Sequence, residues 1–224
     1  FNNIRTPEEA NIRKSNMINC LDDNVRVELG KETPQGGEAA FISLERALDD
    51  LKAGKINVLI TAPIDKKNIQ SERFNFRGHT DYLKAKTGVD EVLMFMISEN
   101  MRIGFVTDHV PLRKVPELIT VDSLIKKIRL MNQSLIIDFG IRKPQIAVLG
   151  LNPHAGEETL LGAEETDVII PAINQAEKEG IMAFGPFPSD GFFGAGSFSR
   201  FDGIISMYHD QGLAPFKALS FSSG

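Results

Sequence analysis

The chain has 224 residues, of which 42% are hydrophobic and 25% are charged, and its formal net charge is −5. This length and this apolar fraction allow a buried core in one domain or two. The acidic balance argues against a nucleic-acid surface, and no apolar run reaches the length of a membrane span. The single cysteine, Cys20, cannot form an internal disulfide, and no signal peptide is evident, so we expect a cytoplasmic protein with a small-molecule partner.

The first part of the chain contains one clear helical pattern. Up to about Gly30 the pattern is mixed and polar, and it predicts only a peripheral helix or strand. From Glu38 to Lys52, apolar residues recur at steps of three and four, which places them on one helical face. Gly54 is typical of the residue that follows such a helix, so the sequence predicts a helix that ends there.

Four short, nearly continuous apolar runs come next in the sequence. They are Ile56–Thr61, Arg102–Thr107, Gln145–Gly150 and Asp202–Met207. Runs of this kind are typical of strands that are buried on both faces of a parallel sheet. We therefore predict four such strands.

Two helical patterns lie between these runs. One begins at Val121 behind Thr120, which is a suitable cap, and the other extends from Asp167 to Glu179 before Gly180. Pro171 interrupts the second pattern near its start. Because parallel strands need a crossover that is usually helical, the alternation of strands and helices predicts an α/β fold with a largely parallel sheet.

The glycine-rich segments do not form a known phosphate-binding motif. No predicted strand is followed by Gly-x-Gly-x-x-Gly, and there is no Gly-x-x-x-x-Gly-Lys. The segment Gly191–Gly196 lacks both spacings, and it predicts a flexible loop. No local motif therefore assigns the cofactor-binding residues.

Both ends of the sequence resemble cuts in a longer chain. The first residue is Phe1 and not methionine, and Gly224 comes shortly after the strand-like segment Ala218–Phe221. We therefore expect the natural protein to be longer.

All four histidines lie in compact polar motifs, and three of these motifs follow an apolar run. The motifs are Gly78–Thr80, Thr107–His109, Asn152–His154 and Tyr208–Asp210. Ligands of open α/β sheets bind at the carboxyl ends of the strands. The sequence therefore places His109, His154 and His209 at the edge of the sheet where sites form.

Three neutral imidazoles at one edge could bind zinc or a similar divalent ion and leave positions open for a substrate. A single histidine at a strand end is more often a hydrogen-bonded loop residue, so this interpretation depends on the shared edge. The histidines are too far apart in the sequence for a helical His-x-x-x-His pair, so only folding could bring them together.

Two carboxylates and a lysine accompany these histidines. Asp210 adjoins His209, Asp190 immediately precedes Gly191, and Lys217 follows Asp210 by seven positions. A carboxylate can orient a metal-bound imidazole, and a lysine can hold a phosphate or a carboxylate as a point charge. Taken alone, each of these residues is more often a solvated surface charge.

Five motifs in this order resemble the 4-hydroxythreonine-4-phosphate dehydrogenase family. They are Thr61–Lys66, Phe76–Asp81, Asp108–Arg113, Leu151–Glu157 and Met207–Lys217. The resemblance spans about Glu32 to Gly224, and its most specific parts are the segments NPHAGE and MYHDQG. The first thirty residues match the family only loosely.

The resemblance implies the two-domain α/β architecture of isocitrate and isopropylmalate dehydrogenases, which bind their cofactor without the usual Rossmann glycines. It implies that residues 1–224 form two interleaved subdomains, whose boundary the sequence does not fix. The family begins with a strand and a glycine-rich turn and continues beyond Gly224, so both family termini are expected to be missing. Much of the nicotinamide site would lie in those termini, and the cofactor-binding residues stay unknown.

The resemblance also implies roles for individual residues. The metal-binding histidines of the family fall on His109, His154 and His209. Its substrate-contacting histidine and threonine fall on His79 and Thr80. The family's metal site lies at the subunit boundary of a homodimer, so one histidine could come from the partner chain.

Three further residues are the candidates for catalysis. Lys217 matches a substrate-contacting lysine, and Asp190 and Asp210 match acidic residues near the metal. Which of them accepts a proton is left open by the resemblance.

The implied reaction belongs to the synthesis of pyridoxal 5'-phosphate, or vitamin B6. It oxidises 4-phosphohydroxy-L-threonine to 2-amino-3-oxo-4-phosphooxybutanoate, with hydride transfer to NAD or NADP, and decarboxylation follows. One divalent ion (Zn, Mg or Co) could polarise the substrate oxygen in both halves of the reaction.

Three other functions are compatible with the same residues. The motifs would also serve a related dehydrogenase that acts on erythronate or threonate 4-phosphate. A three-histidine zinc hydrolase could use an open metal site to activate water. A binding protein without catalysis is the third alternative, if the ends of the sequence are real in the cell.

Overall fold

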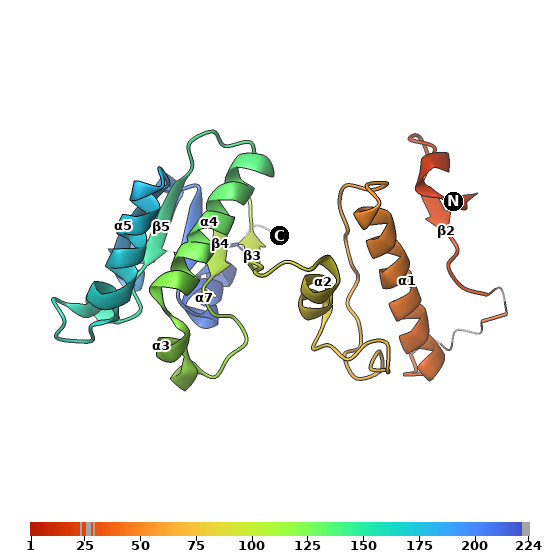
Figure 1. Cartoon of the computed structure of the whole chain (residues 1–224), viewed down its shortest axis with the longest axis horizontal. Coiled ribbons are helices and arrows are strands. Elements are labelled where there is room, and N and C mark those ends of the chain that lie inside the picture. Colours follow the sequence, from red (N-terminus) through yellow and green to blue (C-terminus); the bar gives the residue numbers. More distant parts are fainter. Residues whose placement is uncertain (23, 26–27, 29, 221–224) are drawn as a thin grey trace. The chain divides into compact units, whose positions relative to one another are not determined.

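The computed structural model describes residues 1–22, 24–25, 28 and 30–220 (Figure 1). The chain divides into two compact units, Phe1–Asp90 and Glu91–Gly224. Each unit has its own hydrophobic core, so each packs around its own apolar side chains.

The first unit is built around one long helix. Its elements are β1 (Asn2–Ile4), η1 (Pro7–Glu9), β2 (Asn16–Ile18), α1 (Pro34–Lys52) and α2 (His79–Thr87), with β1 and β2 parallel.

Helix α1 confirms the helix predicted up to Lys52 and begins four residues earlier than its predicted start. The side chain of Thr33 caps it by accepting a hydrogen bond from the Gly36 N–H, and Pro34 occupies the first turn, where no backbone N–H is needed. Gly54 follows the helix in the left-handed region, with φ of 69°.

The strand predicted over Ile56–Thr61 is wrong. This segment belongs to no strand, and the side chains of Val58 and Ile60 are 71% and 91% exposed. A buried parallel strand needs a paired neighbour and cover on both faces. No described segment pairs with this one, and Val58 and Ile60 stay exposed, whereas Leu59 packs partly against the core of the first unit.

Aromatic side chains form the core of the first unit. Phe74 and Tyr82 are fully buried with ring centroids 5.1 Å apart, and the rings of Phe41 and Phe76 meet them edge-on. Such edge-to-face pairs add stability beyond the area that they bury. The core joins α1 to α2 through these side chains.

A five-stranded sheet forms the second unit. Its strands are β3 (Phe95–Ile97), β4 (Arg102–Phe105), β5 (Gln145–Leu149), β6 (Met182–Phe187) and β7 (Gly203–Ser206), in the order β3-β4-β7-β5-β6. All neighbours are parallel except β3 and β4. Strands β4, β5 and β7 confirm three of the four predicted strands, and the α/β fold with a largely parallel sheet is confirmed with them.

The second unit also contains helices, most of which lie between these strands in the sequence. They are η2 (Leu112–Lys114), α3 (Val115–Leu118), α4 (Val121–Ile137), η3 (Pro153–Gly156), η4 (Glu165–Ile169), α5 (Ile170–Lys178), α6 (Ser189–Gly194), η5 (Ser197–Arg200) and α7 (His209–Ser220). The predicted cap of α4 is confirmed, because Thr120 and Ser123 each accept a hydrogen bond from the backbone N–H of the other.

The helix predicted over Asp167–Glu179 is present with an irregular start. Residues Glu165–Ile169 form a π-helical turn, and α5 begins at Ile170. Pro171 then lies in the first turn of α5, where its missing N–H costs little. Gly180, with φ of 80°, follows the helix end as predicted.

Two local predictions are wrong. The glycine-rich segment predicted as a flexible loop is helical up to Gly194, because Phe192 of α6 is buried and packs against the rings of Phe187 and Phe201. The strand-like residues from Ala218 to Ser220 form the last turn of α7 instead, while Phe221 lies outside the described residues. In the first segment tertiary packing overrides local propensity, and in the second the residues continue helix α7.

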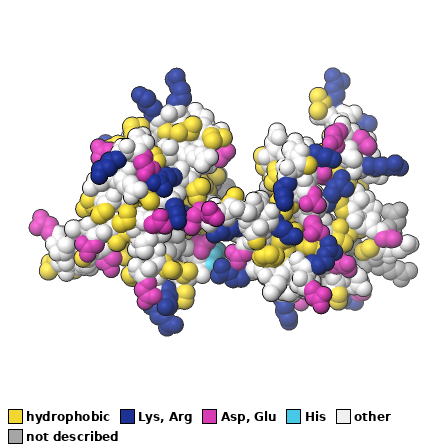
Figure 2. Space-filling model, in the orientation of Figure 1, with side chains coloured by type: hydrophobic (Ala, Val, Ile, Leu, Met, Phe, Trp, Pro, Cys, Tyr) yellow, Lys and Arg dark blue, Asp and Glu magenta, His cyan; other side chains and the backbone are white. Residues whose placement is uncertain are grey.

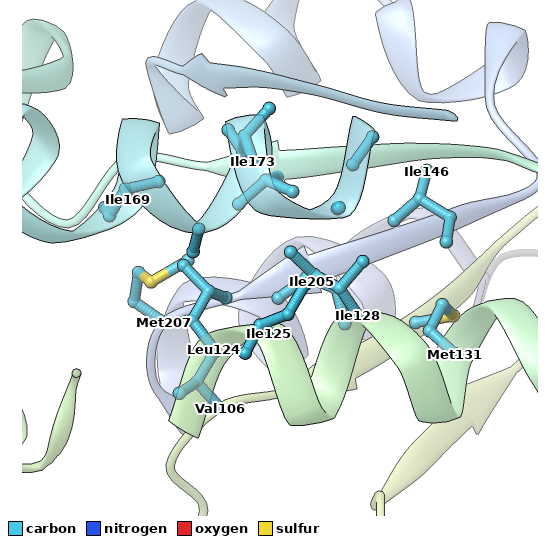
Figure 3. Packing of buried hydrophobic residues seen from close by; sticks show 14 of the residues in the cluster. Val106, Leu124, Ile125, Ile128, Met131, Ile146, Ile169, Ile173, Ile205 and Met207 are labelled. Atoms are coloured by element: carbon cyan, nitrogen blue, oxygen red, sulfur yellow. The ribbon is translucent and has the colours of Figure 1, made fainter. Parts of the chain in front are cut away.

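Helices cover both faces of the sheet. On one face, Ile146, Val148 and Ile205 pack against α4 and α5 through residues such as Leu124, Ile128 and Ile173 (Figure 3). On the other face, the alternate strand residues Ala147, Leu149 and Ile204 pack against Phe192 of α6 and Phe216 of α7. This alternation between the two faces is the period of two that strands impose.

The visible surface of each unit carries charges of both signs. Lys and Arg side chains are interspersed there with Asp and Glu side chains (Figure 2). Among the described residues, no helix combines the length and the hydropathy that crossing a membrane requires.

Candidate functional site

Three of the four histidines follow neighbouring parallel strands. His109 follows β4, His209 follows β7 and His154 follows β5, and these strands are adjacent in the order β4-β7-β5. Their carboxyl ends therefore meet at one edge of the sheet, as the sequence predicts.

Thr107 connects the two strand ends that precede His109 and His209. The hydroxyl of Thr107 donates a hydrogen bond to the Met207 carbonyl oxygen at 2.8 Å, and the Thr107 N–H donates to the same oxygen at 3.2 Å. The side chain of Thr107 is buried. The pairing of β4 with β7 thus extends to within two residues of both histidines, which limits how far they can separate.

The rings of His109 and His209 lie side by side. Their centroids are 5.4 Å apart, and the ring of Phe105 stacks on His209 at 5.9 Å. Nδ1 of His209 lies 2.7 Å from Oδ1 of Asp210, so this nitrogen donates to the carboxylate. The Nε2 atom of His209 is then the nitrogen with a lone pair for a ligand.

These two histidines line a cavity of about 330 Å³. The side chain of His109 is 69% exposed and that of His209 is 29% exposed. The lining combines polar and apolar side chains, and its residues are Asp108, His109, Val110, Leu112, Val115, Tyr208, His209 and Asp210. A small polar ligand fits such a mixture of groups.

His154 lies on a turn with an unusual backbone. Six consecutive residues, His154–Thr159, have positive φ, and five of them are not glycine. The left-handed region costs about 1–2 kcal/mol for each such residue, so the turn stores strain. His154 is exposed there, which leaves its imidazole accessible.

Gln211 holds the start of the His154 loop against β7. Its side-chain oxygen accepts a hydrogen bond from the Met207 N–H at 2.7 Å, and its amide nitrogen donates to the Gly150 carbonyl oxygen at 2.5 Å. Gln211 is buried, so it joins the ends of β7 and β5 from inside. The sequence does not predict three buried polar residues near these strand ends. They are Thr107, Glu165 and Gln211.

The other predicted residues lie at element ends. Asp190 is exposed in the first turn of α6, after β6, and Lys217 is exposed on α7. His79 and Thr80 are the first two residues of α2 in the first unit, where the N-terminus of the helix favours an anion.

The Thr61–Lys66 segment ends in a tight turn and not at the end of a strand. The Asp65 carboxylate accepts hydrogen bonds from the N–H groups of Asn68 at 2.8 Å and Lys67 at 2.9 Å. These bonds lower the pKa of Asp65. Its carboxylate therefore acts as a local cap.

The donor set at the sheet edge suits a divalent metal in part. Two imidazoles are adjacent, and Asp210 orients one of them, as carboxylates commonly do for metal-bound histidines. Among residues 1–220, with the gaps given above, no three His, Cys, Asp or Glu side chains lie close enough together to hold an ion. The structure thus brings together His109 and His209, and it does not bring His154 into a closed group with them.

A largely parallel sheet with helices on both faces, and with a polar cavity at the carboxyl ends of the strands, defines an α/β protein of the class whose sites form at that edge. The chain belongs to the family of the pyridoxal phosphate biosynthetic protein PdxA, whose model matches residues 1–224.

Individual relatives agree with this family. A 4-hydroxythreonine-4-phosphate dehydrogenase of Bacteroides thetaiotaomicron is 46% identical over all of this chain, and one of Sulfurihydrogenibium sp. is 40% identical over 92% of it. The crystal structure of a 4-hydroxythreonine-4-phosphate dehydrogenase from Klebsiella pneumoniae matches with a TM-score of 0.88 and 30% identity, over 98% of this chain and 68% of that chain. The present chain spans 62% of the length of both curated relatives.

Proposed function

We propose that this protein is an NAD-dependent or NADP-dependent oxidoreductase that oxidises 4-phosphohydroxy-L-threonine in the synthesis of pyridoxal 5'-phosphate. The observation that carries the proposal is the pair of His109 and His209 beside Asp210, at the carboxyl edge of the sheet. The names of the relatives supply the substrate.

We infer that His109, His154 and His209 hold one divalent ion (Zn, Mg or Co). The adjacent rings of His109 and His209 and the contact between His209 and Asp210 support this inference. When bound, the ion would supply positive charge next to the substrate oxygen. In this proposal the site lies at the boundary of a homodimer, and one histidine could come from the partner chain.

The substrate is held in this proposal by Lys217, His79 and Thr80. The ammonium group of Lys217 suits the phosphate or the carboxylate of the substrate as a point charge. The backbone N–H groups at the start of α2, where His79 and Thr80 lie, suit an anion in the same way. Their role is to position the substrate, which raises the rate by fixing geometry.

The chemistry needs one base. A nicotinamide cofactor, when bound, would accept the hydride from C3 of the substrate, and Asp190 and Asp210 are the candidates for the base that takes the proton of the C3 hydroxyl. The product, 2-amino-3-oxo-4-phosphooxybutanoate, is a β-keto acid, and it then loses carbon dioxide. Lys217 can donate a hydrogen bond to the substrate during either half of the reaction.

The remaining parts of the proposal concern the whole protein. We propose the two-domain, interleaved architecture of isocitrate and isopropylmalate dehydrogenases and a cytoplasmic location. The residues that bind NAD or NADP are not assigned.

Steady-state assays on the purified protein test this function. We expect NADH or NADPH to form with 4-phosphohydroxy-L-threonine and a divalent ion. Reduction of the nucleotide only with erythronate or threonate 4-phosphate would favour the related dehydrogenase. Turnover without nucleotide reduction would indicate a hydrolase, and binding without turnover would indicate a binding protein.

Two sets of variants test the residue roles. Replacing any two of His109, His154 and His209 with alanine should abolish stoichiometric metal binding, and unchanged metal content would refute the ligand assignment. Lys217→Ala should raise KM for the substrate while the affinity for NAD stays near its original value. Selective loss of NAD binding would show that Lys217 belongs to the cofactor site instead.

A further inference from the structure

Glu165 is a buried carboxylate whose partners all lie at the start of the His154 loop. Its side chain is 3% exposed, at the first residue of the π-helical turn before α5. Its Oε1 atom accepts hydrogen bonds from the N–H groups of Leu151 and Asn152, both at 2.7 Å. Its Oε2 atom accepts a third from Nδ2 of Asn152 at 2.9 Å.

Two glycines let the loop approach this carboxylate closely. A Cβ atom on Gly156 would lie 2.7 Å from Oε2 of Glu165, and one on Gly150 would lie 3.1 Å from Oε1. Gly156 belongs to the left-handed turn His154–Thr159 and has φ of 86°. The loop therefore contacts Glu165 both before and after His154.

The left-handed turn needs such an anchor. Residues other than glycine relax from this region toward the right-handed or extended regions unless their surroundings hold them. Two backbone hydrogen bonds lie within the loop itself. The Glu157 N–H donates to the His154 carbonyl oxygen, and the Leu161 N–H donates to the Gly156 carbonyl oxygen. Neither bond connects the turn to the sheet. Glu165 connects the start of the loop to η4, the turn that precedes α5, and Gln211 connects Gly150 to β7.

We propose that Glu165 is a positioning residue for His154. By holding Leu151, Asn152 and the turn around Gly156, it keeps the His154 imidazole at the edge of the sheet where His109 and His209 lie. The proposal deepens the proposed function, since it takes from it the role of His154 as a metal ligand. A negative charge is suited to this task because one carboxylate can accept all three hydrogen bonds at once.

Glu164 provides a matched control. Its Oε2 atom accepts a hydrogen bond from the same Nδ2 of Asn152 at 2.8 Å, and the hydrogen bonds from the Leu151 and Asn152 N–H groups go to Glu165. Glu164→Gln and Glu165→Gln remove the same charge from adjacent positions with little change in volume. If Glu165→Gln changes metal affinity or amide exchange and Glu164→Gln does not, the cause is the lost anchoring of the loop, because both variants lose one negative charge.

The experiment measures cobalt binding and amide exchange on the purified protein. We expect Glu165→Gln to weaken Co²⁺ affinity about tenfold or more in calorimetry, the size of effect seen when groups that orient metal ligands are lost. Amide hydrogens of residues 151–156 should exchange faster in the same variant. Glu164→Gln should stay within about twofold of the parent protein in affinity.

Three outcomes would overturn the proposal. Equal effects of the two variants would show that charge alone matters. A lower Tm for Glu165→Gln with unchanged Co²⁺ affinity would show a purely structural role. If Glu165→Gln fails to fold, Glu165→Asp keeps the charge but is one methylene shorter, and unchanged Co²⁺ affinity in that variant would overturn the proposal.

Metal affinity of the parent protein tests the proposed function, and amide exchange in the variants tests the role of Glu165 separately. A parent protein without Co²⁺, Zn²⁺ or Mg²⁺ affinity would refute the metal site. Amide exchange would then decide about Glu165 alone: faster exchange over residues 151–156 in Glu165→Gln, but not in Glu164→Gln, supports the anchor. Unchanged exchange in both variants would overturn it.

Discussion

Similar apolar runs form buried strands in the second unit but not in the first. In the second unit, Gln145–Gly150 and Asp202–Met207 contain the adjacent strands β5 and β7, whose side chains are almost entirely buried. In the first unit, Ile56–Thr61 has the same pattern, yet Ile60 is 91% exposed and belongs to no strand. An apolar run therefore indicates a need for cover, and a strand forms only where other segments provide it.

The units also differ in what holds them together. The second unit places its buried side chains in layers on both faces of a sheet, mostly aliphatic on one face and with Phe105, Phe192 and Phe216 on the other, whereas the first unit has one smaller cluster that is centred on aromatic rings. A layered core spreads its stability over many residues. We expect single substitutions to cost more in the aromatic cluster, and the predictions below test that difference.

Phe74→Ala should have the largest effect on stability. Phe74 is fully buried and contacts the rings of Phe41, Phe76 and Tyr82, so its removal leaves a large cavity. We expect a loss of about 3–5 kcal/mol in the free energy of unfolding of the first unit. Amide exchange should accelerate over residues 34–87, while β4, β5 and β7 keep their protection.

The matched control for this prediction is Phe1→Ala, since Phe1 is 95% exposed. That variant should change stability by less than about 0.5 kcal/mol. A loss below about 1 kcal/mol for Phe74→Ala would contradict the assignment of the aromatic cluster as the core of this unit.

Gly203→Ala tests how tightly the layered core is packed. A Cβ atom at this position on β7 would lie 2.6 Å from Sδ of Met131 and 2.9 Å from Cδ1 of Leu135, both of which are fully buried. Because these side chains of α4 cannot move into solvent, we expect a cost of about 1–3 kcal/mol in chemical denaturation. The control is Gly194→Ala, where a Cβ atom would meet nothing within 4 Å, and a similar cost there would show that packing is not the cause.

Thr120→Ala should have a smaller effect in the same unit. The substitution removes the hydroxyl that caps α4 by accepting from the Ser123 N–H at 3.1 Å. We expect a loss of about 0.5–2 kcal/mol, measured from the denaturation midpoint. Thr120→Ser keeps the hydroxyl and should retain most of the stability; equal losses in both variants would exclude the cap as the source.

Much of the second unit could be predicted because its signals are local. The period of the apolar residues indicates α4 and the strands β4, β5 and β7, and Thr120 marks a helix start by its own chemistry. Because sites form at the carboxyl ends of strands, the sequence alone is enough to place His109, His154 and His209 at one edge of the sheet.

The parts that could not be predicted depend on distant partners. Gln211 bonds to Gly150, 61 positions away, and Thr107 bonds to Met207, 100 positions away. Nothing in the sequence of His154–Thr159 indicates a left-handed turn, because only one of its six residues is glycine. Helix α6 likewise depends on the burial of Phe192, which a short glycine-rich segment does not reveal.

The smallest expected effect belongs to Ile60→Thr, and it returns to the contrast between the two apolar runs. Isoleucine and threonine are both β-branched and both favour extended backbone, so the substitution isolates the burial of the side chain. Because Ile60 is 91% exposed, we expect a change within about 0.5 kcal/mol in the unfolding free energy of the 224-residue chain.

The matched variant is Ile205→Thr on β7, where the same change places a hydroxyl in the buried layer between the sheet and α4 (Figure 3). Ile205 is fully buried, so the loss of apolar contacts and the burial of the hydroxyl together should cost about 2 kcal/mol or more. Denaturation curves of the two variants under one set of conditions give the comparison directly. Equal costs at the two positions would mean that Ile60 is covered in solution, and the contrast between the two units would then be wrong.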